Sequence, residues 1–91
     1  MLMAETTRGG EAVSPQIGKM GVISLSAKNF KLEGVPFNIK NDGETAVTLE
    51  VNLYGDEPGN FIATRFEVGW NPEIIREIKQ TSQTIDLKWG Y

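Results

Sequence analysis

The chain has 91 residues, nine basic and twelve acidic side chains, a net charge of −3, no cysteine and no histidine. The missing cysteines exclude a disulfide framework and a thiolate site, and the missing histidines remove the commonest general base and metal ligand. The charges are scattered, without the basic stripe of a nucleic-acid-binding protein. Composition therefore predicts one small non-enzymatic domain with no cofactor, no metal site and no nucleic-acid partner.

The chain divides at residue 19 by composition. Met1–Lys19 is small, polar and interrupted by glycine, without a helical or strand period, and is predicted to form an extended, flexible N-terminal arm. Residues 20–91 are predicted to form a single β domain. The N-terminus lacks the basic and apolar regions of a signal peptide, and no apolar run approaches the roughly 20 residues that span a bilayer.

The first strand is predicted at Met20–Ala27, where apolar side chains fall on odd-numbered positions. Phe30 and Leu32 place the alternation on even numbers, and after Gly34 it returns to odd numbers. One extra residue must therefore be absorbed near Gly34, by a bulge or by a turn.

The strongest pattern in the chain is Val35–Tyr54, two alternating stretches joined by Asn41-Asp42-Gly43. A two-residue loop would place the apolar residues of the two strands on opposite faces. A three-residue loop pairs Phe37 with Val47 and places them on one face. The sequence thus predicts a β-hairpin with a three-residue loop.

Two strands have an expected place in their sheet. Pro36 has no ladder donor, so Val35–Lys40 is predicted to be an edge strand, or to begin paired on one side only. Phe61–Val68 carries apolar residues on both faces, which predicts a central position or an outer face that is covered.

A short helix is predicted near 71–79. Asn71 is a good N-cap, Pro72 suits the first helical position, and Glu73 complements the helix dipole. The apolar stripe of this helix would be made by Ile74, Ile75 and Ile78. Two turns are not stable alone, so the helix would lie on the sheet or plug one end of it.

The chain closes with an alternating stretch, Ile85, Leu87, Trp89 and Tyr91, which predicts a last strand with the C-terminus tied into a sheet. The predicted fold class is mainly β, a small immunoglobulin-like sandwich or partly open barrel of five to seven strands. One short helix near 71–79 and the N-terminal arm complete it.

The stretch F-N-I-K-N-D-G-E-T-A-V-T-L-E-V-N-L resembles strand–turn–strand pieces of immunoglobulin-like sandwich domains, although the chain lacks the cysteine pair of antibody-type domains. With the arm, the short chain and the absence of cysteine and histidine, the domain is similar to small accessory proteins of tailed-phage particles. Those proteins decorate or join capsid and tail subunits. The resemblance implies a virion or cytoplasmic location and transfers no functional residues.

The leading functional hypothesis is a non-enzymatic structural or assembly protein, a virion component of capsid or tail, that binds neighbouring subunits through its arm and a sheet edge. Its partners would be protein subunits of a larger assembly, including copies of itself. The partner-binding candidates are Met1, Leu2, Met3, Arg8, Val13, Ile17, Pro36, Tyr54 and Trp70.

The alternative hypothesis is a monomeric β-sandwich module that binds carbohydrate or peptide by stacking on Trp70 and Tyr54. The structural interpretation of Trp70 is packing under the predicted helix. Catalysis is disfavoured because the carboxylates alternate with apolar residues or lie in loops, as on solvated strand faces.

Overall fold

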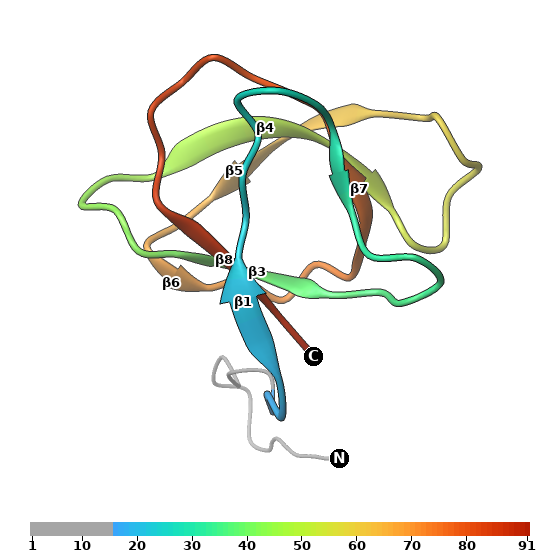
Figure 1. Ribbon diagram of the computed structural model, residues 1–91, viewed down its shortest axis with the longest axis horizontal. Helices are drawn as coiled ribbons and strands as arrows, with labels where there is room; N and C mark the ends of the chain where they lie inside the picture. The colour runs from blue at the N-terminus through green and yellow to red at the C-terminus, as the bar shows by residue number, and fades with distance from the viewer. Residues whose placement is uncertain (1–15) are drawn as a thin grey trace.

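The computed structural model describes residues 16–91, which form eight strands and no helix (Figure 1). The strands are β1 (Met20–Val22), β2 (Phe30–Lys31), β3 (Asn38–Asn41), β4 (Val47–Leu53), β5 (Ile62–Phe66), β6 (Gly69–Trp70), β7 (Ile75–Ile78) and β8 (Leu87–Gly90). They form two antiparallel four-stranded sheets, ordered β1-β8-β3-β6 and β2-β7-β4-β5, that do not close into a barrel. The mainly-β prediction is confirmed, with eight strands in place of five to seven.

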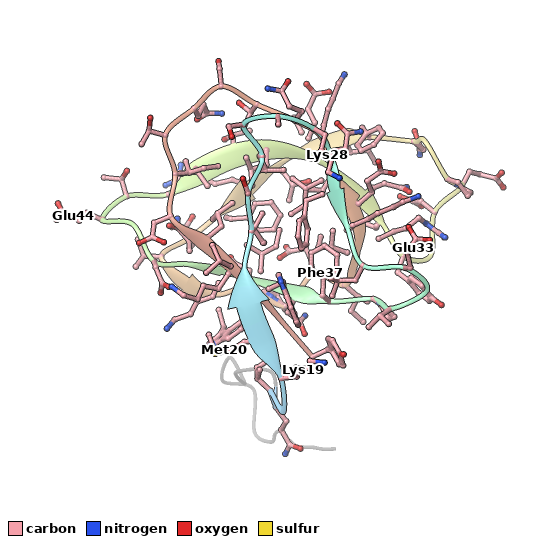
Figure 2. All side chains as sticks on the ribbon, in the orientation of Figure 1. Lys19, Met20, Lys28, Glu33, Phe37 and Glu44 are labelled. Carbon is pink, nitrogen blue, oxygen red and sulfur yellow. The ribbon has the colours of Figure 1, made fainter. Side chains whose placement is uncertain are left out.

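Both sheets contribute to one core. Phe37 lies between the sheets, whereas Glu44 points away from the body (Figure 2). The ring of Phe30 meets that of Phe37 edge to face, with centroids 5.5 Å apart. The buried apolar side chains are Ile23, Leu25, Phe37, Ile39, Leu49, Val51, Phe66, Ile75, Ile78 and Leu87. Burial of these side chains supplies the main driving force for folding.

The predicted hairpin is wrong, because its two strands belong to different sheets. β3 pairs with β8 and β6, whereas β4 pairs with β5 and β7. The connecting residues cross from one sheet to the other. An inward-facing alternation has the same appearance in a hairpin and in two strands that face each other across a core.

The side chain of Asn41 holds this crossing. It is 1% exposed and accepts a hydrogen bond from Gly43 N at 2.9 Å through Oδ1. Its Nδ2 donates to the carbonyls of Thr45 and Phe66 at 2.9 and 3.2 Å. Asn41 thereby connects the first sheet to the last residue of β5, in the second.

The prediction of an edge strand at Val35–Lys40 is wrong, because β3 lies between β8 and β6. Ile39 O accepts a hydrogen bond from Asn71 N on the β6 side. Pairing along the stretch begins with Phe37, whose bridge is to Ile75 on one side, so the alternative of a strand that begins paired on one side only is confirmed. The extra residue near Gly34 is absorbed by a turn. Gly34 has a φ of 69°, in the region that favours glycine.

The predicted helix near 71–79 is also wrong, and a β-bulge explains the error. Val51 pairs with Ile78 and Asn52 with Glu77, but Leu53 pairs with Ile75, so Arg76 is an extra residue in β7. The bulge turns both Ile75 and Ile78 inward, each 0% exposed. Their spacing of three is also the spacing of a helical face.

The expected strand at Phe61–Val68 is confirmed over Ile62–Phe66, but its expected central position is wrong. β5 pairs with β4 and, within residues 16–91, with no strand on its other side. On its outer face Ala63 and Arg65 are exposed and Phe61 is half-buried, so the described residues do not fully cover that face.

The two ends of the described chain meet. β1 is shorter than predicted, and β8 lies between β1 and β3, which confirms the last strand. Gly18 N and Lys19 N donate to Tyr91 O at 2.7 and 3.0 Å, and Tyr91 N donates to Lys19 O at 3.0 Å. The expected tie of the C-terminus to a sheet is thus confirmed. Residues 16–91 contain no helix of the length and apolarity needed to cross a membrane.

Candidate interaction surfaces

The outer side of the first sheet carries an apolar face, formed by Ile17, Met20, Val22 and Trp70. Met20 pairs with Gly90, so the Met20 side chain and the Cβ position of Gly90 lie on the same side of the sheet. A Cβ atom built on Gly90 would lie 2.5 Å from the Trp70 ring and 2.8 Å from Ile17. The absence of a side chain at Gly90 thus lets Ile17 and Trp70 lie over β8. Met20 and Val22 remain 46% and 68% exposed.

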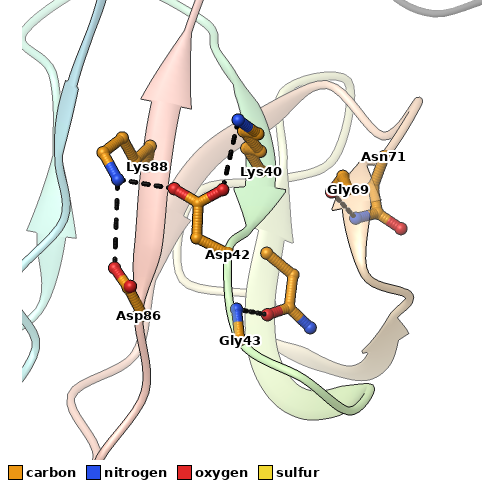
Figure 3. A network of polar contacts seen from close by, with 8 residues as sticks. Lys40, Asp42, Gly43, Gly69, Asn71, Asp86 and Lys88 are labelled. Atoms are coloured by element: carbon orange, nitrogen blue, oxygen red, sulfur yellow. Dashed lines mark hydrogen bonds and ion pairs between the residues drawn. The ribbon is translucent and has the colours of Figure 1, made fainter.

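The same face carries a small network of charges, because Lys88 lies opposite Val22 and Lys40 lies opposite Trp70 (Figure 3). Lys40 and Lys88 are directly opposite each other on β3 and β8, an arrangement of like charges that is unfavourable by itself. The carboxylate of Asp42 accepts a hydrogen bond from Lys88 and lies 3.2 Å from Lys40 Nζ. Asp86 lies 3.9 Å from Lys88. Asp42 and Asp86 together balance the two lysine charges.

The same contacts shift two pKa values. The hydrogen bond from Lys88, and then the charge and hydrogen bond of Lys40, hold the pKa of Asp42 below its usual value, against the opposing effect of desolvation. The hydrogen bond to Asp42 raises the pKa of Lys88. Both groups therefore stay charged at neutral pH, as a structural ion cluster requires.

Tyr54 belongs to a separate cluster at the end of β4. The guanidinium carbon of Arg76 lies 5.2 Å from the centroid of its ring. Arg76 Nη2 donates to the carbonyls of Tyr54 and Asp56 at 2.6 and 3.0 Å. Arg76 is the extra residue of the β7 bulge, so the bulge directs this cation onto the loop after β4.

The structure accounts for the predicted partner-binding residues as follows. Ile17 and Trp70 are brought together over Gly90, whereas Tyr54 directly follows β4 of the other sheet. Pro36 is half-buried beside the isolated bridge of Phe37 with Ile75. Outside the described residues lie Met1, Leu2, Met3, Arg8 and Val13.

The stacking platform of the alternative hypothesis is not assembled. Trp70 belongs to β6 of the first sheet. Tyr54 lines a hollow of about 200 Å³, and Trp70 is not among the residues that line it. Small-molecule sites typically enclose roughly 300–1,000 Å³. Residues 16–91 also contain no group of three acidic side chains placed to hold a metal ion.

Sequence reasoning missed the exposed edge of β5, with Ala63 and Arg65 at its centre. No local signal marks it, because a strand has the same alternation at an edge or inside a sheet. The sheet order alone makes it an edge.

The fold and these surfaces define a small all-β protein of two antiparallel sheets. No protein-family model, curated protein or solved structure matches the chain.

Proposed function

We propose that the protein is a non-enzymatic structural subunit of a larger assembly, and that it binds neighbouring subunits through Met1–Lys19 and through a sheet edge. The assembly that the sequence resemblance suggests is a virion, in its capsid or tail. The proposed fold type is an immunoglobulin-like arrangement of the two sheets. The sheet edge is assigned to β5, since Val35–Lys40 is largely enclosed by its neighbours.

The observation that carries the proposal is the attachment of the arm at its base. Three main-chain hydrogen bonds join Gly18 and Lys19 to Tyr91, beside the exposed side chains of Met20 and Val22. Gly18 and Lys19 are therefore held next to an apolar surface, close to the point where residues 1–15 join the described domain. A segment attached in this way adds contact area to a small domain without enlarging its core.

Deletion of residues 2–15 tests this role, because it leaves the hydrogen bonds of Gly18 and Lys19 in place. The full chain is expected to sediment with large particles from its native source, and the deletion variant to remain at the top of the gradient. Thermal unfolding of the purified variant is the control for its folding. Undiminished incorporation of a folded variant would exclude a role of residues 2–15 in binding.

A further inference from the structure

The direction of the main-chain groups on β5 follows from the hydrogen bonds of β4. Lys79 N donates to Glu50 O, and Tyr54 N donates to Ile74 O, so the main-chain groups of Glu50 and Tyr54 point toward the β7 side. In an antiparallel sheet, successive residues of a strand direct these groups to alternate sides. Val47, Leu49 and Val51 therefore direct theirs to β5.

The partners of these three residues in β5 are Phe66, Thr64 and Ile62, so those residues use their main-chain groups within the sheet. Ala63 and Arg65 direct their N–H and C=O groups outward. Within residues 16–91 no hydrogen bond satisfies these four groups. Unpaired groups of this kind on an edge are a template for another strand.

The edge is limited at one end by Asn71. Glu67 N donates to Asn71 Oδ1 at 3.0 Å, and Asn71 Nδ2 donates to Glu67 O at 2.9 Å. The side chain of Asn71, 5% exposed, thus occupies the position that a partner strand would take opposite Glu67. The free groups of Ala63 and Arg65 remain next to this capped position.

Several of the usual protections of an edge strand are lacking on β5. Its pairing with β4 is regular over five residues without a bulge, and it contains no proline or lysine. Its one charged residue, Arg65, forms an ion pair with Glu67 at 2.7 Å. Ile62 is 48% exposed at the other end of the strand.

We propose that β5 pairs with β5 of a second copy of this chain, antiparallel about a two-fold axis at Thr64, joining two four-stranded sheets into one of eight strands. This inference deepens the proposed function, since it names the partner at the sheet edge. The register pairs Ala63 with Arg65 of the other copy. Each of the two equivalent pairs makes two main-chain hydrogen bonds, so that all four free groups of both copies are used.

The register shifted toward Glu67 fits less well. A shift that centres the axis on Arg65 places two arginines directly opposite each other, and Ala63 then faces the capped groups of Glu67. In the proposed register Thr64 faces its own copy across a close, non-hydrogen-bonded pair. Exposed Ile62 lies opposite Phe66 of the second copy. The contact is smaller than a standard interface of about 1,200–2,000 Å², so a dimer with a Kd in the micromolar to millimolar range is expected.

Disulfide formation tests the register, because the chain has no cysteine of its own. The Cα atoms of a non-hydrogen-bonded pair lie about 4.5 Å apart, within the range that a disulfide spans. Thr64→Cys is therefore expected to form a covalent dimer under mild oxidation. Ala63→Cys is the matched control, since the Cα atoms of residue 63 in the two copies would lie more than about 7 Å apart.

Sedimentation of the purified proteins tests the edge without cysteine. The wild-type chain is expected to shift from monomer to dimer with rising concentration. Ala63→Pro should abolish the shift but keep the fold, because the lost N–H points away from β4. The proposal is overturned if the wild-type chain stays monomeric and Thr64→Cys forms no more dimer than Ala63→Cys. That result would leave the role of residues 2–15, which the particle experiment tests separately, unaffected.

Discussion

The substitution Asn41→Ala tests whether one buried amide holds the two sheets together. The side chain is 1% exposed and makes three hydrogen bonds, to Gly43 N, Thr45 O and Phe66 O. A net hydrogen bond contributes about 0.5–1.5 kcal/mol, and an unsatisfied buried partner costs more. The expected loss is therefore about 2–4 kcal/mol, a large part of the roughly 5–15 kcal/mol typical of a domain.

The assay is urea unfolding followed by the fluorescence of the two tryptophans, with the free energy of unfolding taken from linear extrapolation. Asn60→Ala, at an exposed position, is the control and is expected to change stability by less than about 0.5 kcal/mol. Asn41→Asp keeps the acceptor for Gly43 but places a second oxygen against two carbonyls, so it should also be destabilised. If Asn41→Ala behaves like the control, the amide does not hold the crossing.

Three further predictions follow from single contacts. Gly21→Ala would place a Cβ atom 2.6 Å from the Trp89 ring and should cost about 1–3 kcal/mol in urea unfolding, whereas Gly55→Ala, with open space around it, should cost far less. Because the pKa of Asp42 is lowered in the fold, its ion pairs stabilise the protein above the usual pKa of 3.8. The stability advantage of the wild type over Asp42→Asn should therefore be full at pH 7 and decline as the pH falls through the lowered pKa. Equal acid unfolding profiles would contradict this. Arg76→Gln should speed amide hydrogen exchange in the loop after β4, and an unchanged exchange pattern would show that the guanidinium does not hold that loop.

The alternation of side chains predicted much of the burial pattern. Phe37, Leu49, Val51 and Leu87 are buried as the period of two requires, and the turn near Gly34 is present where the parity changes. The local signals for the 71–79 segment were misleading. The bulge at Arg76 gives an inward spacing of three, which a helix shares, and pairing of β7 with β2 and β4 outweighs the weak helical preference of two turns.

Of the partner-binding candidates, the sequence could point to residue types but not to their assembly. Ile17 and Trp70 lie together because Gly90 leaves room over β8. Gly90 is distant from both residues along the sequence. Tyr54 is directed elsewhere, onto the Arg76 side chain of the bulge. No pattern in the neighbouring sequence indicates either the Ile17–Trp70 contact or the Tyr54–Arg76 contact.

The sequence by itself determined the mainly-β character and much of which side chains face inward, because both depend on the period of the apolar residues along each strand. Only the tertiary structure decided which strands are neighbours. Main-chain hydrogen bonds are the same for every residue type, so the pairing of β3 with β8, the crossing held by Asn41 and the free edge of β5 depend on how the two sheets close over a shared core.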